Sequence, residues 1–479
     1  MKLNKINDWT WEIPKTGRMN VPGRIIASEK LLTQIRSDKA AEQVANVACL
    51  PGIVGYALAM PDAHWGYGFP IGGVAATDPE QGGVVSPGGV GYDINCGVRL
   101  MTTKLDYADV RSRVRDMVTA LYKAIPCGIG SEGAIKTLDK KNMDTMLAKG
   151  AAWAVSEGYG TKADLDTTEE GGCMPGANPR AVSNRAKERG STQVGTLGSG
   201  NHFAELQVVE KIFQPNLAEA FGLHEGQVVL MIHSGSRGLG YQVCDDFIHT
   251  MLQAASKYRI HLPDRQLCCA PVNSQEGHTY LAAMACAANY AWTNRQIMMD
   301  LARRALRKTL EISAADLGGK LLYDVCHNIA KFETHEVDGE ARRLCVHRKG
   351  ATRAFPGDSK DVPAIYRHAG QPVLVPGSMG TGSYVFAGTQ GAMDTTFGSC
   401  CHGAGRVMSR TQAKKSHDAS KLLADLERQG IFVMARSNRT VVEEAPGAYK
   451  RVDDVADVCD KAGIGKKVAR LRPIGVVKG

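Results

Sequence analysis

The stretch Ser86-Pro-Gly-Gly-Val-Gly-Tyr-Asp-Ile-Asn-Cys-Gly-Val-Arg99 places Asp93 and Cys96 three residues apart, in a turn that contains four glycines. A carboxylate and a thiolate on so tight a loop are typical of metal ligands. A buried structural cysteine beside a turn-forming aspartate would give the same pattern. The stretch alone leaves a metal site and a packed turn as equal alternatives.

Three further segments each carry one histidine, in a glycine-rich turn or at the end of an apolar, strand-like run. They are Gly195-Thr-Leu-Gly-Ser-Gly-Asn-His-Phe-Ala-Glu205, Val229-Leu-Met-Ile-His-Ser-Gly-Ser-Arg-Gly238 and Tyr323-Asp-Val-Cys-His-Asn328. Taken singly, His202, His233 and His327 would each more often be a hydrogen-bonded core histidine. Together with the carboxylate and the thiolate they form a ligand set for one or two divalent transition metals. By ligand softness such a set would hold Zn²⁺ more tightly than Mn²⁺, so the residues alone do not name the metal.

The composition is that of a globular protein with an unusual amount of glycine. The chain has 479 residues, of which 43% are hydrophobic, enough for a sizeable core. It has 53 glycines, where average usage would give about 34. They concentrate around the motifs described here, which suits backbone that must approach phosphates closely.

Charge and cysteine usage indicate the kind of partner and the compartment. The formal net charge of +9 favours a polyanionic partner without proving one. The 13 cysteines are odd in number and lack disulfide-like spacing, and the chain opens on Met1-Lys-Leu-Asn-Lys rather than on an apolar segment. We therefore expect a reducing compartment, the cytoplasm by default. The uncharged runs are too short or too polar for a transmembrane helix, so no membrane association is expected.

Apolar periodicity predicts an α+β fold, with a single large domain over residues 1–479 and a peripheral excursion at 126–193. Helices are expected at 29–48, 107–125, 138–157, 178–189, 239–259, 276–311, 413–429 and 452–462. Strands are expected at 229–233, 321–327, 343–348, 372–376 and 383–387, with Asp338-Gly339 as a hairpin turn.

A second chemical motif, Cys401-His-Gly-Ala-Gly-Arg-Val-Met-Ser-Arg410, surrounds His402 with small residues. Such residues let a substrate phosphate lie against the backbone. A structural histidine before a glycine turn would look the same, and the residues alone favour a phosphate contact over a nucleophile. The chain contains neither a P-loop nor the Lys-x-Asp-Gly motif of ligases that carry a nucleotide on lysine. This absence leaves room for a route through histidine and metal.

The motifs together resemble the signature set of the RtcB-type RNA-splicing ligases. The resemblance runs in order from about Met60 to Lys478, so chance similarity is a remote explanation. It rests on Asp93-x-x-Cys96, Gly-Ser-Gly-Asn201-His202-Phe-x-Glu205, His233-Ser-Gly-Ser-Arg237, His327-Asn328, His347-Arg-Lys-Gly-Ala-Thr-Arg353, Pro376-Gly-Ser-Met379 and Cys401-His402-Gly-Ala-Gly-Arg406.

The resemblance implies a fold in which strands and helices surround a central metal and nucleotide cleft. It implies two Mn²⁺ ions that share Cys96, with Asp93 and His202 on one ion and His233 and His327 on the other. It further implies that the imidazole of His402 attacks the α-phosphorus of GTP and forms a covalent histidine-GMP intermediate.

The expected GTP pocket consists of turns and short side chains that offer donors to phosphates and to the guanine edge, and of a family lysine near the carboxy terminus. Its residues are Asn201, His202, Phe203, Ala204, Glu205, His327, Asn328, Pro376, Gly377, Ser378, Met379, Ser383, His402, Gly403, Ala404, Gly405 and Lys478. Arg237, Arg353 and Arg406 are the candidates for RNA phosphates, because forked guanidinium donors suit phosphate oxygens. Surface salt bridging is the competing explanation for these arginines.

The function implied is GTP- and Mn²⁺-dependent ligation of RNA, joining a 3′-phosphate or 2′,3′-cyclic phosphate end to a 5′-hydroxyl end. The resemblance leaves an archease-type activating partner open. Three alternatives remain: a relative that stops after guanylylating a 3′-phosphate, a binuclear metallophosphoesterase, and a non-catalytic RNA-binding subunit. The last is disfavoured because the five candidate ligands and His402 are all present.

Overall fold

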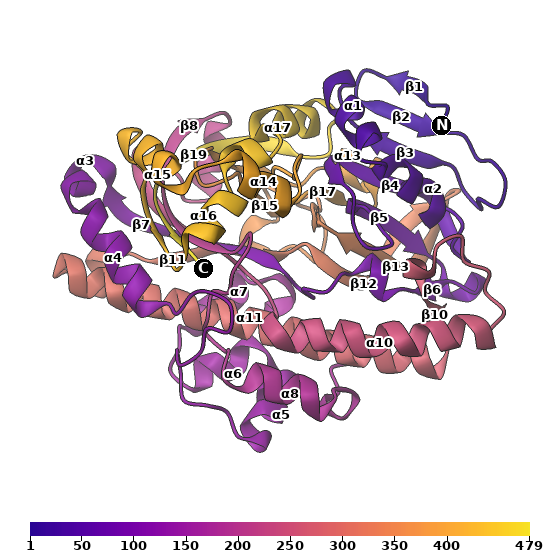
Figure 1. The fold of residues 1–479 in the computed structure, drawn as a ribbon, viewed down its shortest axis with the longest axis horizontal. Coiled ribbons are helices and arrows are strands. Elements are labelled where there is room, and N and C mark those ends of the chain that lie inside the picture. The colour runs from indigo at the N-terminus through magenta and orange to yellow at the C-terminus, as the bar shows by residue number, and fades with distance from the viewer.

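The computed structural model describes residues 1–479, which fold as two mixed β-sheets lying side by side with helices packed around them (Figure 1). This is the expected α+β class. The largest part of the core contains side chains of both sheets, and the residues singled out above lie mainly at the ends of their strands.

The first sheet has seven strands in the order β1-β2-β3-β4-β5-β13-β12. Their bounds are Asn4–Asn7 (β1), Thr10–Ile13 (β2), Gly23–Ile26 (β3), Ile53–His64 (β4), Ile71–Thr77 (β5), Glu340–Lys349 (β13) and Asn328–Val337 (β12). All neighbours are antiparallel except β3 and β4. The expected hairpin turn is confirmed: Val337 pairs with Glu340, and Asp338 and Gly339 have φ values of 55° and 80°.

The second sheet follows the order β11-β7-β9-β8-β19-β16-β15, with β18 parallel to β19 beside this path. The bounds are Lys320–Cys326 (β11), Gly97–Asp106 (β7), Gln227–Ser234 (β9), Phe203–Ile212 (β8), Lys466–Lys478 (β19), Ser383–Ala387 (β16), Pro372–Val375 (β15) and Phe432–Ala435 (β18). Its outermost strands, β11 and β15, contact each other, so the sheet nearly closes on itself. The expected strands at 229–233, 321–327, 372–376 and 383–387 all belong to it.

Two short pairs of strands complete the β-structure. β6 (Val84–Val85) pairs with β10 (Ala270–Pro271), and β14 (Ala351–Arg353) pairs with β17 (Ser399–Cys401).

Two long helices, α10 (Arg237–Lys257) and α11 (Gln275–Leu310), run along the lower side of the sheets (Figure 1). The middle of α11, residues 283–299, is buried on every side of the helix. Such a helix needs partners all round. The sheets cover one side of it, and α5 (Lys140–Lys149) and α6 (Ala151–Ser156) cover another.

The remaining helices are shorter. They are α1 (Glu29–Ser37), α2 (Ala40–Val47), α3 (Tyr107–Val110), α4 (Val114–Ala124), α7 (Lys162–Asp166), α8 (Asn184–Ser191), α9 (Pro215–Ala220), α12 (Ala314–Leu317), α13 (Gln390–Thr396), α14 (Arg410–Ser416), α15 (Ala419–Arg428), α16 (Asn438–Glu443) and α17 (Val452–Lys461). Helices α5, α6 and α8 come from the segment 126–193 and form the lower lobe in Figure 1, against α10 and α11. No helix has the length and apolarity that crossing a membrane requires.

Several expected helices are interrupted, which corrects the sequence prediction. The helix expected at 29–48 breaks at Lys39, whose φ of 66° is left-handed, and the one at 138–157 breaks at Gly150. The helix expected at 413–429 breaks at His417, which is extended. The segments 107–125 and 178–189 contain 3₁₀ turns in place of continuous helix. The apolar spacing persists across each break, so periodicity alone does not reveal it.

Candidate metal and nucleotide cleft

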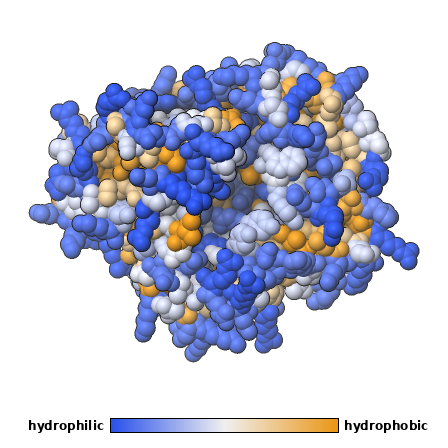
Figure 2. All heavy atoms as spheres, viewed as in Figure 1, coloured by the Kyte–Doolittle hydropathy of each residue, from blue (hydrophilic) through white to orange (hydrophobic).

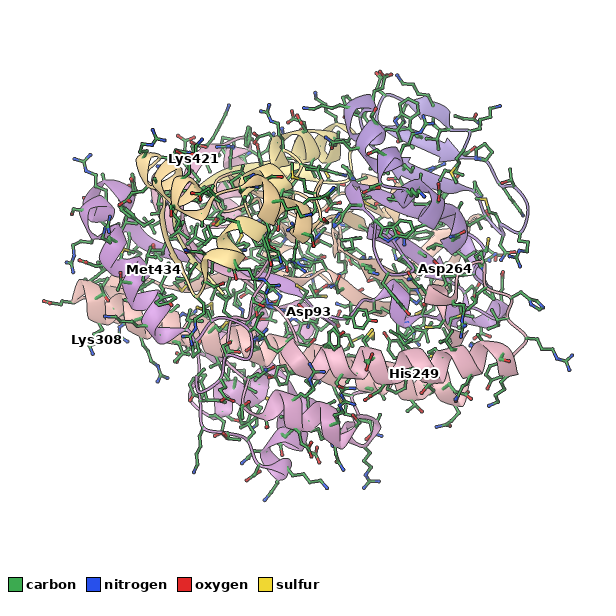
Figure 3. The ribbon with its side chains drawn as sticks, viewed as in Figure 1. Asp93, His249, Asp264, Lys308, Lys421 and Met434 are labelled. Atoms are coloured by element: carbon green, nitrogen blue, oxygen red, sulfur yellow. The ribbon has the colours of Figure 1, made fainter.

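The five expected metal ligands meet at one edge of the second sheet because of its strand register. Cys96 immediately precedes β7, whose first residue pairs with Ser234 of β9 and with Cys326 of β11. The neighbouring pair of Phe203 with His233 joins β8 to β9. Strand ends that pair in this way bring His202, His233 and His327 around the Cys96 turn. Asp93 lies near the centre of the molecule, just above α10 (Figure 3).

The ligand atoms form two groups that share the Cys96 thiol, one with His233 and His327 and one with Asp93 and His202. Cys96 Sγ lies 3.2 Å from His233 Nε2 and 3.6 Å from His202 Nε2. His327 Nε2 is 3.1 Å from His233 Nε2, and His202 Nε2 is 2.9 Å from Asp93 Oδ2. Within each group, all candidate ligand atoms lie within 4.8 Å of one another.

The chemistry of these donors fits two divalent cations. Burial lowers the pKa of both His233 and His327, which keeps their imidazoles neutral, as metal ligation requires. Burial alone would raise the pKa of Asp93, but His202 outweighs it and lowers the value to about 2. Burial and the Asp93 carboxylate raise the pKa of the Cys96 thiol, so a bound cation would be needed to ionise it. The other ring nitrogen of His202 lies 3.0 Å from the carbonyl of Leu197, the kind of contact that orients metal-bound imidazoles.

A buried ionic network holds the Cys96 turn in place. The Arg295 guanidinium donates to the carbonyls of Asn95 and Ser234, each at 2.8 Å, and pairs with Asp324. Arg99 pairs with the same carboxylate, and both arginines are fully buried. Asn95 has a left-handed φ of 51°, a conformation that asparagine adopts more readily than most other residues. The network therefore fixes the backbone on both sides of the shared ligand.

His402 lies beside the metal ligands and is oriented by a buried carboxylate. It follows β17, and its ring centroid is 5.2 Å from that of His327. Asp62 Oδ2, on β4, lies 2.5 Å from His402 Nδ1 and also accepts hydrogen bonds from the backbone N–H groups of His402 and Gly403. Gly405 packs so closely on β4 that a Cβ there would lie 2.1 Å from the Asp62 carbonyl oxygen. This geometry assigns the ring proton to Nδ1 and leaves the Nε2 lone pair free.

A cleft opens over these groups. Figure 2 shows a hollow near the middle of this face, with α14 and α16 on its left and β4 and β5 on its right in Figure 1. Asp93, Cys96, His233 and His327 line it. Fourteen of the residues expected at the nucleotide line it as well: Asn201, Phe203, Glu205, His327, Asn328, Pro376, Gly377, Ser378, Met379, His402, Gly403, Ala404, Gly405 and Lys478.

A family model described as tRNA-splicing ligase RtcB matches residues 43–479 of this chain. The chain belongs to the RtcB family. A tRNA-splicing ligase RtcB from Archaeoglobus fulgidus is 54% identical over 479 residues, covering 100% of this chain and 99% of the relative. The protein of the same name from Thermococcus kodakarensis is 53% identical, with the same coverage of both chains. An RNA-splicing ligase RtcB from Mycobacterium tuberculosis is 50% identical over 441 residues, covering 91% of this chain and 100% of the relative.

Three of the expected nucleotide residues do not line the cleft of this RtcB-family chain. His202 lies beneath it among the metal ligands, and Ala204 is buried in β8. Ser383 is also buried, where its hydroxyl accepts a hydrogen bond from the backbone N–H of Gly377 at 3.2 Å and another from Gln207. Ser383 therefore supports the turn that begins at Pro376.

Lys478 is held in the cleft because β19 is an interior strand. It pairs with Phe203 of β8 and is only 4% exposed. Glu205, on β8 two residues after Phe203, is only 2% exposed, and burial raises the pKa of its carboxyl to about 8. The same burial lowers the pKa of Lys478. The Glu205 carboxyl therefore holds its proton more strongly, and the Lys478 ammonium less strongly, than the exposed groups would. Both side chains face the expected nucleotide pocket.

The three arginines expected at RNA phosphates have different surroundings. Arg406 lines the cleft, where its guanidinium contacts Glu444 and Tyr449. Arg237 begins α10 beside the metal ligands, and its Nε donates to Thr196 Oγ1 at 3.2 Å.

The expectation for Arg353 needs correction. Its side chain is buried away from the cleft and pairs with Glu169 at 3.3 Å and with Glu170 at 3.0 Å. Both carboxylates come from the segment 126–193, so in this structure Arg353 ties that segment to the sheets.

Sequence reasoning missed several residues of the site. Asp62 and His64 come from β4, and polar residues inside that otherwise apolar strand were the available signal. Lys349 also lines the cleft, and burial lowers its pKa to about 7. Its Nζ donates to the backbone carbonyl of Tyr67 at 2.5 Å. Three aromatic residues that line the same cleft, Trp65, Tyr67 and Tyr92, were not anticipated either.

Proposed function

We propose that this chain is a GTP- and Mn²⁺-dependent RNA ligase that joins a 3′-phosphate or 2′,3′-cyclic phosphate end to a 5′-hydroxyl end. The observation that carries the proposal is the pairing of His402 with Asp62 beside two ligand groups that share Cys96. Membership of the RtcB family and the names of its curated relatives support the ligase activity and an RNA substrate.

The first step follows from the orientation of His402. Its Nε2 attacks the α-phosphorus of GTP, so a P–N bond forms while the bond to the bridging oxygen breaks and pyrophosphate leaves. The ring gains positive charge as this happens. Asp62 keeps the proton on Nδ1 and stabilises that charge, as a buried carboxylate does for other nucleophile-activating histidines.

Two further transfers complete the ligation. An oxygen of the RNA 3′-phosphate attacks the phosphorus of the histidine-bound GMP, which breaks the P–N bond and leaves the RNA end activated. The 5′-hydroxyl then attacks the RNA phosphate, a phosphodiester forms and GMP leaves. A 2′,3′-cyclic end is first opened by water.

Bound divalent ions would polarise the phosphoryl oxygens and stabilise the leaving groups in each transfer. Asp93, Cys96, His202, His233 and His327 would hold them.

The chain itself positions the nucleotide and the RNA. The turns at 376–379 and 403–405 line the cleft with small residues, which let a nucleotide phosphate lie close to the backbone. Glu205 and Lys478 offer side chains to the nucleotide from the paired strands β8 and β19. We expect RNA phosphates to be bound by Arg406, which lines the cleft, and by Arg237, at the start of α10.

A binuclear phosphoesterase could use the pair of His402 and Asp62 as a general acid or base. The match to the RtcB family and the names of the curated relatives favour nucleotidyl transfer over hydrolysis.

The test uses the whole purified chain with α-³²P-labelled GTP and Mn²⁺. Label should become covalently bound to the protein through an acid-labile bond, as expected of a phosphoramidate, and His402→Ala should remain unlabelled. Addition of two RNAs, one with a 3′-phosphate and one with a 5′-hydroxyl, should release the label as GMP and give a joined product. Absence of labelling would contradict the proposal, whereas labelling followed only by transfer to the 3′-phosphate would indicate the capping alternative.

A further inference from the structure

Four aromatic side chains gather at the mouth of the cleft, and three of them are in ring contact. Trp65, Tyr67 and Tyr92 line the cleft, and Tyr241 lies beyond them on α10. The Tyr67 and Tyr92 rings meet edge to face with centroids 5.6 Å apart. Tyr92 and Tyr241 are stacked at 4.8 Å, with an angle of 25° between their planes. We call these four residues the aromatic row.

The ends of the aromatic row are open to solvent. Trp65 is 49% exposed and Tyr241 is 46% exposed, whereas Trp153 and Trp292 are buried. The backbone N–H of Trp65 donates to Asp38 Oδ2 at 3.1 Å, which fixes the loop that carries the indole. Three segments far apart in the chain, 65–67, 92 and 241, converge to build the row. Exposed aromatic rings gathered beside a site in this way indicate a ligand that covers them.

A basic side chain lies near each end of this set. Lys349 Nζ lies 6.0 Å from the Tyr67 ring centroid, and the exposed Arg189 guanidinium lies 5.3 Å from that of Tyr241. Exposed aromatic rings with a guanidinium beside them match a single nucleic-acid strand, whose bases stack while its phosphates seek positive charge. A duplex would not suit the row as well, because its base faces are already covered.

The position of the row relates it to the reacting groups. Tyr92 is the residue before Asp93, and both line the same cleft, so the row lies next to the candidate metal ligands. The row arises from the loop after β4, from the Asp93 turn and from α10, while the turns expected at the nucleotide lie in residues 376–379 and 403–405. The cleft therefore offers separate surfaces to the nucleotide and to an RNA strand.

We propose that Trp65, Tyr67, Tyr92 and Tyr241 form a stacking surface for the unpaired bases of an RNA strand entering the cleft. The inference rests on the proposed function, since it assigns the strand-binding surface of the same site. It predicts a preference for RNA ends with unpaired bases, with little dependence on base identity, because every base has a stacking face.

The test measures the affinity of the full chain, without GTP, for a fluorescent single-stranded RNA ending in a 3′-phosphate. The same RNA with abasic terminal nucleotides serves as the second probe. Wild-type protein should bind the normal RNA about tenfold more tightly than the abasic one. Trp65→Ala and Tyr241→Ala should each reduce this difference, and Trp65→Phe should restore most of it.

Tyr258→Ala is the matched control, because Tyr258 is an exposed tyrosine at the far end of the same helix. It should bind both RNAs as wild type does. Equal affinity of wild-type protein for normal and abasic RNA would overturn the proposal, as would equal weakening of both probes by Trp65→Ala. Labelling of the protein by GTP is measured in parallel, so failure of the proposed ligase chemistry is seen separately from failure of the stacking surface.

Discussion

Asp62 and His402 are 340 residues apart in the chain, yet their side chains meet at 2.5 Å between Oδ2 and Nδ1. Burial would raise the pKa of Asp62, but the His402 ring and its hydrogen bonds outweigh burial and lower that pKa. The carboxylate is therefore ionised at neutral pH and can fix the tautomer of the ring. This one contact therefore determines that Nε2 is the nitrogen of His402 that is free to act as the nucleophile.

Asp62→Asn should slow the labelling of the protein by GTP about 100-fold or more, because the amide cannot stabilise the charged ring and can orient the wrong tautomer. The rate is measured from the time course of labelling at saturating GTP. Metal content should be unchanged, since Asp62 belongs to neither ligand group. A labelling rate equal to wild type would show that His402 needs no orienting carboxylate.

Cys96→Ser should lower the metal content of both ligand groups, because the shared thiolate is replaced by an alcohol that stays protonated near pH 7. Elemental analysis after dialysis gives the stoichiometry, and GTP labelling should be lost with it. Cys244→Ser is a suitable control, since Cys244 is equally buried but lies in neither group. Full metal content in Cys96→Ser would mean that the cysteine is only packed there.

His402→Ala and His233→Ala should separate activation from sealing when the RNA already carries a 3′-guanylylated phosphate. His402 is needed only to carry GMP, so His402→Ala should seal this RNA without added GTP. His233→Ala should fail, because loss of a metal ligand removes charge stabilisation from every phosphoryl transfer. An inactive but folded and metal-loaded His402→Ala on this RNA would require a second role for the ring.

Arg353→Ala should lower the free energy of unfolding by about 3 kcal/mol, because Glu169 and Glu170 lose a buried partner.

Arg237→Ala should instead reduce RNA ligation more than it reduces GTP labelling. Denaturant unfolding and the two activity assays are compared for both variants. Unchanged stability together with weakened RNA binding in Arg353→Ala would restore the original expectation for that arginine.

Glu205→Gln should remove the contribution that this carboxyl makes to the pH dependence of the free energy of unfolding. The unfolded carboxyl ionises near its ordinary pKa of 4.5, whereas the folded one keeps its proton up to about pH 8. The unfolded chain therefore binds fewer protons between these values, and the contribution of Glu205 to stability falls as pH rises through that window. Melting temperatures from pH 5 to 8 should show a shallower decline in Glu205→Gln than in wild type, and parallel curves would contradict the raised pKa.

The positions of the candidate ligands could be predicted because each lies in a turn or at the end of an apolar run, where a polar side chain is conspicuous. The paired register of β7, β8, β9 and β11 then explains how they meet. Asp62 was missed because its importance depends on a partner 340 residues away. Arg353 was misassigned because a strand arginine has the same sequence pattern whether it faces a cleft or a buried carboxylate.

The hairpin at Asp338-Gly339 was predictable because its turn is fixed locally by two left-handed residues. The break at Lys39 was not, because a lysine has no intrinsic preference for φ above zero and takes it only under tertiary constraint. The aromatic row was also invisible in the sequence, since its members come from three separate segments.

β19, which pairs with both β8 and β16, follows these two strands in the chain and is synthesised after them. Until residues 466–478 are available, both neighbours present unpaired edges to solvent, and the sheet cannot close. A nascent chain that stops before residue 466 would lack Lys478. It would also expose the unpaired edges of β8 and β16, which favour aggregation. Translation errors that truncate the protein should therefore yield aggregation-prone material for degradation, and not a partly active enzyme.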